Sequence, residues 1–199
     1  DDRWTPEKLE LQLPLFAEEQ VGVVYSRQRY IDHNDEQVDV RIRRKTLVPR
    51  QGVVTAHLFM DNFIPFSSTV VRAECFDKFG GFDESIAMGI DWDLWLRIST
   101  EFEFAYVDEP LLIYRIGHPG QMSKNAPTRH ECSDYIMSKF MGDYPDLVPP
   151  ALYERAMAFT WCNRGSYYAN QDLARSFGSY LRALRLRPLD SAVYGRVLK

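Results

Sequence analysis

The stretch from Gly80 to Arg97, which reads GGFDESIAMGIDWDLWLR, decides the fold that we expect for this chain. Gly80 and Gly81 permit positive backbone φ angles, so a helix can end here and a turn can follow. Beyond this turn, residues at i, i+3, i+4 and i+7 predict the buried face of a helix that opens at Asp91. These residues are Trp92, Trp95, Leu96 and Ser99.

Segments on both sides of this stretch alternate between β-rich and helical patterns, which predicts an α/β domain. Strands are expected at residues 21–25, 67–72, 104–107 and 111–115, with Pro110 dividing the last two. Helices are expected at residues 5–19, 54–60 and 73–79, in addition to the helix from Asp91. Residues 27–44 are expected to form a charged ribbon with Asn34 and Asp35 at a hairpin tip.

The remainder of the chain has helical patterns, so we place a domain boundary between residues 128 and 129. Residues 151–169 and 172–187 predict a C-terminal helical hairpin that resembles one tetratricopeptide unit. Because a single unit cannot bury its face alone, we expect the hairpin to pack on the preceding domain. The end of the chain is basic, which suits either a solvated face or contact with anionic lipid or a polyanionic glycan precursor. The basic residues are Arg175, Arg182, Arg185, Arg187, Arg196 and Lys199.

Composition narrows the class of protein further. The chain has 199 residues, 45% of them hydrophobic, which suffices for one compact core with a small appendage. The formal net charge of −4 shows no basic bias, so we expect no nucleic acid as a partner. Cys75, Cys132 and Cys162 form no C-x-x-C spacing, which favours a reducing cytoplasmic setting over a disulfide framework. No apolar run suggests a membrane span, and a targeting segment before the first residue stays an open alternative.

Three motifs, taken in order, carry a resemblance to a known family. They are the acidic opening DDRWTP at residues 1–6, the GGFDE loop at 80–84 and the DWDLWLR helix at 91–97. In this order they resemble the second half of a family 2 glycosyltransferase, the inverting GT-A type. The resemblance implies a partial GT-A fold with a mixed sheet over residues 1–128. It also implies that the chain begins inside an Asp-x-Asp motif, so the isolated chain should lack the nucleotide-binding half and be inactive.

The resemblance implies roles for individual residues. Asp91 would be the catalytic base that takes a proton from the acceptor hydroxyl, and the alternative is a helix cap. Family members carry Glu before this Asp, whereas this chain has Ile90, which puts the substrate class in doubt. Asp83, Glu84 and Trp92 would contact the acceptor sugar. The alternative for the loop is a structural turn. Trp95 could also stack on sugar, but its helical spacing favours core packing.

A second set of implied roles concerns the donor diphosphate. Residues 114–123 resemble the Tyr-Arg-x-His segment that closes over the diphosphate in the family, with one extra glycine before His118. Arg115 would pair with phosphate, and His118 would bind phosphate or a cation. Asp1 and His118 would then hold Mg²⁺ or Mn²⁺, which neutralises the leaving diphosphate. An ordinary surface loop is the alternative for this segment.

Together these expectations describe a glycosyltransferase that moves a sugar from a nucleoside-diphosphate donor to a glycan or lipid-linked acceptor with inversion. We expect it in the cytoplasm, with peripheral association at the inner face of the cell membrane as a further option. Two alternatives stay open, both of them non-catalytic. One is a glycan-binding domain derived from a transferase, and the other is a protein-interaction module built on the helical hairpin.

Overall fold

The structure is a computed structural model that describes residues 2–39, 48–117 and 125–197. The chain divides into two compact units, Asp1–Lys124 and Asn125–Lys199. This division falls slightly before the boundary suggested by the sequence, because the first helix of the second unit already begins at Ala126. The Asn125 side chain caps this helix by accepting a hydrogen bond from the Thr128 amide at 3.3 Å.

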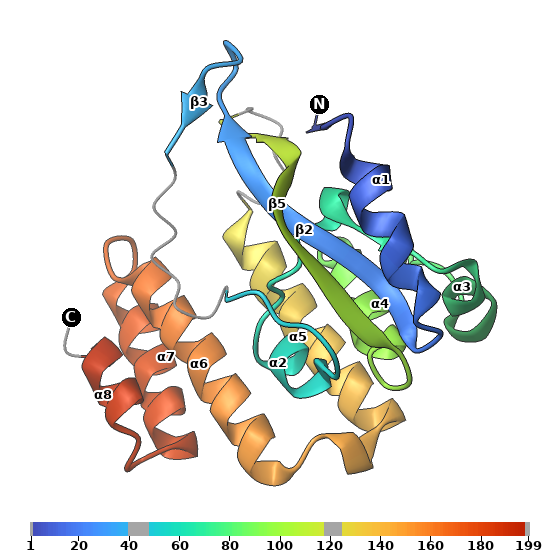
Figure 1. The fold of residues 1–199 in the computed structure, drawn as a ribbon. Coiled ribbons are helices and arrows are strands. Elements are labelled where there is room, and N and C mark those ends of the chain that lie inside the picture. Colours follow the sequence, from blue (N-terminus) through green and yellow to red (C-terminus); the bar gives the residue numbers. More distant parts are fainter. Residues whose placement is uncertain (1, 40–47, 118–124, 198–199) are drawn as a thin grey trace. The chain divides into compact units, whose positions relative to one another are not determined.

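The first unit is an α/β structure built around a mixed, open sheet (Figure 1). Its strands are β1 (Arg3–Trp4), β2 (Val21–Ile31), β3 (Gln37–Val38), β4 (Val70–Val71) and β5 (Glu103–Arg115). The strand order is β1-β5-β2-β3, and β4 also pairs with β2. Strands β2 and β5 run parallel along their whole lengths, whereas the other pairs are antiparallel. Because β5 occupies one edge of β2, both β3 and β4 must lie along its other edge.

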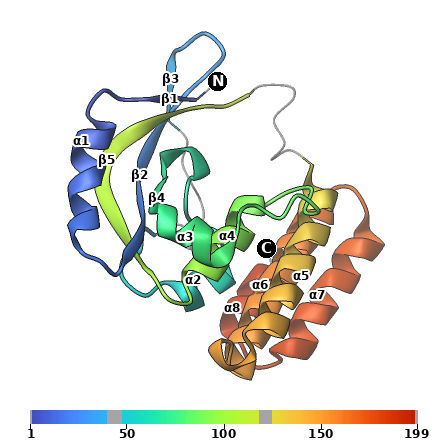
Figure 2. The same ribbon diagram turned by 90° about the vertical axis from the view of Figure 1, so that its right-hand side faces the viewer.

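Helices cover both faces of this sheet. They are α1 (Lys8–Gln12), α2 (Thr55–Met60), α3 (Ala73–Phe79) and α4 (Ile90–Ile98), with 3₁₀ helices η1 (Leu13–Ala17) and η2 (Phe66–Ser68). Figure 2 shows α1 on one side of β2 and β5, and α2, α3 and α4 on the other. The predicted buried face of α4 is confirmed, since Trp92, Trp95, Leu96 and Ser99 are all buried.

Two proline residues change the elements that the sequence predicts. The predicted helix over residues 5–19 is wrong in length, because α1 ends at Gln12 and a short 3₁₀ helix follows. Pro14 lacks the amide hydrogen that a continuing α-helix would need. The two strands expected around Pro110 are in fact one strand, β5. The register of β5 against β2 shifts at Arg27, which pairs with Pro110, so an irregularity accommodates the proline without ending the strand.

The predicted hairpin tip at Asn34 and Asp35 is confirmed by the turn between β2 and β3. Asp35 has a φ of 68°, a left-handed conformation that aspartate tolerates better than most residues. The Asp32 carboxylate accepts hydrogen bonds from the amides of Asn34 and Glu36 at 2.8 and 3.0 Å. These local bonds specify the turn from its own residues.

The second unit is entirely helical in its described part. It contains α5 (Ala126–Asp143), α6 (Pro150–Tyr168), α7 (Leu173–Leu186) and α8 (Ser191–Val197), with a 3₁₀ turn η4 (Pro145–Leu147). Helices α6 and α7 form the predicted hairpin, and Val193 of α8 joins its core. Gly165 allows the close approach, since a Cβ there would lie 2.6 Å from the Tyr180 ring. Arg164 contributes an ion pair with Asp134 and stacks on Trp161.

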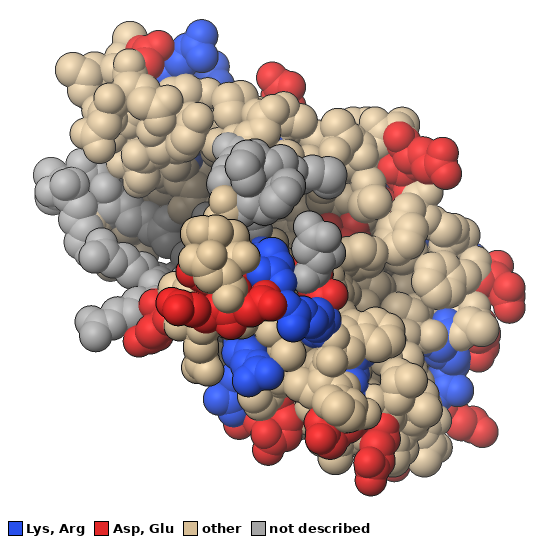
Figure 3. Space-filling model, turned by 90° about the horizontal axis from the view of Figure 1, so that it is seen from above, with Lys and Arg blue, Asp and Glu red and all other residues tan. Residues whose placement is uncertain are grey.

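Charged residues of both signs are interspersed on the face drawn in Figure 3. This mixture agrees with the small net charge of −4. None of the helices in the described part of the chain combines the length and the apolar composition that a membrane span needs.

Candidate active site

Asp91 is the second residue of helix α4, immediately after a sharp turn of the backbone. The N-terminal cap of the helix is Gly89, whose φ of 85° and ψ of 24° lie in the left-handed region that favours glycine. The alternative that Asp91 is the cap residue is therefore wrong. As an acidic residue in the first turn, Asp91 still interacts favourably with the helix dipole.

The Asp91 carboxylate is mostly enclosed and is held by one neutral donor. Asn62 Nδ2 donates a hydrogen bond to Asp91 Oδ2 at 2.9 Å. Burial raises the pKa of this carboxyl group, and hydrogen bonds from Asn62 and from nearby backbone amides offset the rise only in part. A carboxylate with a raised pKa is a stronger base, so it is better suited to accept a proton from a hydroxyl group.

Trp92 packs into the core next to Asp91. Its side chain is 8% exposed, and its indole N–H donates to the Leu58 carbonyl oxygen at 2.7 Å. In this position the ring faces contact protein rather than solvent. The acceptor-stacking role of Trp92 stays a prediction, and the geometry favours core packing instead.

Arg97 joins helix α4 to the glycine loop that precedes it. Its guanidinium forms an ion pair with Asp93 at 2.8 Å, and both side chains are largely buried. The same guanidinium donates to the backbone carbonyls of Phe79 and of Gly81, the latter at 2.9 Å. Arg97 is thus paired with a carboxylate of its own helix. It fixes the start of the GGFDE loop against the helix that carries Asp91.

Asp83 and Glu84 occupy the exposed part of this loop. The Asp83 carboxylate accepts hydrogen bonds from the Ser85 hydroxyl at 2.6 Å and from the Ser85 amide at 3.1 Å. Glu84 is exposed. The Asp83 interactions shape a local turn, so the acceptor-binding roles of both residues stay predictions.

The N-terminal acidic segment and the end of strand β5 lie side by side. Strand β1 pairs with β5, and Arg3 is opposite Ile113. One consequence is that the Arg115 amide donates to Asp2 Oδ1 at 3.2 Å. The structure therefore brings together two segments that the resemblance assigns to the diphosphate site.

The guanidinium of Arg115 is already engaged by protein groups. It donates to the Asp32 carbonyl oxygen at 2.6 Å and forms an ion pair with Asp35, which Arg3 also contacts. These two arginines hold the pKa of Asp35 below its usual range. The interactions tie the β2–β3 turn to β1 and β5, so a phosphate-binding role for Arg115 would require it to exchange partners.

Asp1 and His118, the predicted metal ligands, lie outside the described residues. Within the ranges that the structure describes, there is no cluster of three or more His, Cys, Asp or Glu side chains that could hold a metal ion. The metal site therefore stays a prediction from the resemblance.

The segment from residues 61 to 68 connects Asp91 with the N-terminal region. Asn62 contacts Asp91 at one end of the segment. At the other end, the Ser67 carbonyl accepts a hydrogen bond from the Trp4 indole at 2.7 Å, and the Ser68 carbonyl accepts one from Gln12 at 3.0 Å. Residues far apart in sequence are thus held in one framework by this segment.

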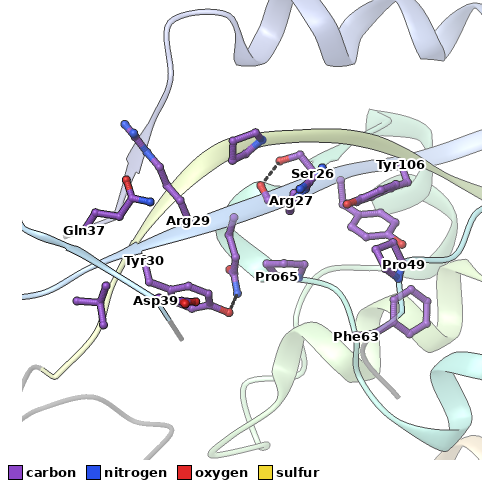
Figure 4. Close-up of a pocket in the computed structure, with 14 residues that line it drawn as sticks. Ser26, Arg27, Arg29, Tyr30, Gln37, Asp39, Pro49, Phe63, Pro65 and Tyr106 are labelled. Atoms are coloured by element: carbon purple, nitrogen blue, oxygen red, sulfur yellow. Dashed lines mark hydrogen bonds between the residues drawn. The ribbon is translucent and has the colours of Figure 1, made fainter. Parts of the chain in front are cut away.

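A cavity of about 470 Å³ opens beside the same segment. Residues 25–30 of β2 and 37–39 around β3 form much of its lining (Figure 4). The other described lining residues are Pro49, Phe63, Pro65, Tyr106 and Pro110. The cavity lies along the edge of β2 between its contacts with β4 and with β3. Asp91 is not part of the lining, but its partner Asn62 directly precedes Phe63.

Sequence reasoning missed several residues of this region. Gln28 and Tyr30 were assigned to a charged peripheral ribbon, although both line the cavity. Lys8 was treated as an ordinary helical residue, yet it is 1% exposed and lies 4.3 Å from the centre of the Trp4 ring. Burial lowers the pKa of Lys8 to about 8.

Comparisons with known proteins assign no family to the chain. Neither the protein-family models nor the curated proteins contain a significant match to the sequence.

Proposed function

We propose that this chain belongs to an inverting glycosyltransferase with a GT-A fold and contributes its acceptor side. A sugar would pass from a nucleoside-diphosphate donor to a hydroxyl group of a glycan or lipid-linked acceptor. The observation that carries the proposal is the Asp91 carboxylate, positioned by Asn62 at the start of α4 with its pKa raised by burial.

The chemistry assigned to Asp91 is general-base catalysis. Its carboxylate takes the proton of the acceptor hydroxyl while that oxygen forms a bond to the anomeric carbon. The bond between the anomeric carbon and the diphosphate oxygen breaks on the opposite face, and the configuration inverts. Asn62 keeps the carboxylate in place, and the Asp93–Arg97 pair stabilises the helix and the adjacent glycine loop.

A divalent cation would supply charge neutralisation for the leaving diphosphate. The resemblance assigns Mg²⁺ or Mn²⁺ to Asp1 and His118. Asp2, the neighbour of Asp1, lies within the described residues, and its carboxylate accepts a hydrogen bond from the Arg115 amide. The role given to Asp91 does not depend on this cation.

Asp91→Asn tests the proposal in the intact protein that contains this chain. The substitution keeps the size of the side chain and removes its basicity, so kcat should fall by about 10²–10⁴-fold. Consumption of UDP-sugars and GDP-sugars, with and without glycan acceptors, provides the assay. Asp77→Asn is the matched control, because Asp77 is exposed on α3 and undergoes the same chemical change. A kcat within about threefold of wild type for Asp91→Asn would exclude Asp91 as the base.

Asn62→Ala provides a second test through pH rather than rate alone. Asn62 donates to the ionised carboxylate, so its removal should raise the pKa of Asp91 further. The acidic limb of the kcat–pH profile should then move to higher pH. If the limb stays in place while Asp91→Asn abolishes turnover, Asn62 does not tune the base.

The rival that a specific observation favours is a glycan-binding domain without turnover. The cavity beside β2 has aromatic and polar groups that suit a sugar, and such a site requires no base. Donor consumption separates the two proposals, because a binding domain would show no turnover with any nucleotide sugar.

A further inference from the structure

The cavity beside β2 is formed by a gap between two short partner strands. Strand β4 pairs with Val23 and Val24, whereas β3 pairs with Tyr30 and Ile31. Between these contacts, no described strand pairs with this edge of β2. The resulting cavity of about 470 Å³ lies within the range of ~300–1,000 Å³ that is typical of small-molecule sites.

Gln28 presents an unsatisfied hydrogen-bond acceptor in this cavity. Its Nε2 donates to the Tyr30 hydroxyl oxygen at 2.6 Å, and Figure 4 shows this bond among the lining side chains. Its Oε1 is buried and has no partner among the described residues. A buried acceptor without a partner is costly, so a ligand donor would be stabilising once a turn of the Gln28 side chain brings the enclosed Oε1 to the cavity.

Tyr30 supplies the complementary donor. Its oxygen accepts from Gln28, which leaves the phenolic hydrogen available to a ligand. Burial raises the pKa of Tyr30, so the hydroxyl group stays protonated at neutral pH. The pair therefore offers one acceptor and one donor side by side, which matches neighbouring hydroxyl groups of a sugar because each can donate and accept.

The rest of the lining is largely apolar. The rings of Tyr25 and Tyr106 lie 5.0 Å apart, and Phe63 lies 6.0 Å from Tyr25. The Tyr25 hydroxyl is fully used, since it donates to the Arg50 carbonyl at 2.6 Å and accepts from the Arg50 amide at 2.7 Å. Tyr25 is buried, so the ring that a ligand would meet is that of the partly exposed Tyr106, which suits the C–H face of a pyranose.

The charges around the cavity favour a neutral ligand. Arg27 is paired with Asp108 at 2.6 Å, so its charge is compensated. Figure 4 shows the Arg29 side chain directed away from Tyr30, and Asp39 contributes a carboxylate to the lining. Among the described lining residues the charges of Arg29 and Asp39 offset one another, so an anionic sugar would gain no net attraction from them.

We propose that this cavity binds one neutral pyranose unit of a glycan, with Gln28 and Tyr30 recognising its hydroxyl groups. Identifying that glycan as the acceptor rests on the proposed transferase function, whereas sugar binding itself does not. The site lies outside the acceptor residues that the sequence suggested, Asp83, Glu84 and Trp92.

The test is equilibrium binding to the intact protein without donor. Cellotriose, maltotriose and mannotriose are the neutral probes, trigalacturonate is the anionic one, and binding is followed by saturation-transfer NMR and calorimetry. At least one neutral trisaccharide should bind in preference to trigalacturonate. Gln28→Leu and Tyr30→Phe should each weaken that binding by about threefold to tenfold, as expected for the loss of one hydrogen bond. Tyr135→Phe is the matched control, because Tyr135 is exposed in the second unit.

The outcomes separate this proposal from the transferase proposal. Failure of every neutral trisaccharide to bind, preference for trigalacturonate, or equal affinity in Gln28→Leu and Tyr30→Phe would overturn the sugar site. Unchanged melting temperatures in both variants ensure that weaker binding is not caused by unfolding. A protein that binds the glycan but consumes no donor would keep the cavity assignment and refute only the transferase. Donor turnover without glycan binding in the cavity would keep the transferase proposal and refute the sugar site.

Discussion

Gly22 should tolerate no side chain, because it lies where β2, α3 and the start of β5 approach most closely. The register of β2 shifts at this residue, with Val21 opposite Glu103 and Val23 opposite Phe104. A Cβ added to Gly22 would lie 2.6 Å from the Cβ of Phe102 and 2.9 Å from the Sγ of Cys75. We therefore expect Gly22→Ala to destabilise the first unit.

The magnitude follows from the displacement that the new methyl group requires. Carbon atoms in contact are ~3.5–4.0 Å apart, so the surroundings must open by about 1 Å. The Cβ of Phe102 moves only with its backbone, so a change of rotamer cannot relieve the overlap. Overpacking of this kind costs about 1–3 kcal/mol. The lower unfolded-state entropy of alanine offsets about 0.4–1 kcal/mol of that.

Urea denaturation and thermal melting of wild type and Gly22→Ala measure this cost. The midpoints of these two ranges leave a net cost of about 1.3 kcal/mol, so at ~2–4 °C per kcal/mol for a chain of this size the melting temperature should fall by roughly 3–5 °C. Gly81→Ala is the matched control, since nothing lies within 4 Å of a Cβ placed there and its φ is not positive. A Gly22→Ala variant as stable as wild type would show that β2 and α3 are not in the close contact described here. An equal loss in Gly81→Ala would mean that the destabilisation does not come from this overlap.

Three further predictions concern pH and helix packing. Burial raises the pKa of Asp91, so ionisation of this carboxyl group opposes folding above its unfolded-state pKa. Asp91→Asn should therefore be more stable than wild type at pH 7. Urea titrations should show that this difference in stability disappears at low pH. Burial, Arg164 and Arg129 lower the pKa of His130 to about 4, so stability should decline as the pH falls from about 6.5 to 4. His130→Phe should reduce this decline in pH-dependent melting curves. Gly165→Ala should lower the melting temperature of the helical unit, because its Cβ would overlap the Tyr180 ring.

Local sequence signals predicted much of the element inventory. The i, i+3, i+4, i+7 pattern identified the buried face of α4, and Asn34-Asp35 identified the β2–β3 turn. Predictions of strand boundaries were wrong where pairing between distant strands overrode a local sequence rule. Pro110 was expected to end a strand, but its position in β5 beside the irregular register with β2 allows the strand to continue.

The candidate site was only partly accessible to the same reasoning. Asp91 could be selected because its place before an amphipathic pattern matches a family motif. The electrostatic environment of Asp91 could not be predicted, because its partner Asn62 is 29 positions away and periodicity carries no information about such a contact. Gln28 and Tyr30 show the same limit, since their alternation with charged residues looks like an exposed ribbon.

By itself the sequence determined the α/β character of the first unit, the helical character of the second and the buried face of α4. These properties follow from side-chain periodicity and turn chemistry, which act over a few residues. Only the tertiary structure decided that β2 pairs in parallel with β5 and that none of the described strands pairs with the edge of β2 between β3 and β4. It also decided that residues 61–68 hold Asp91 and border the cavity. Such features depend on which distant segments pack together, and packing is settled by the shape of the whole unit rather than by any one stretch of chain.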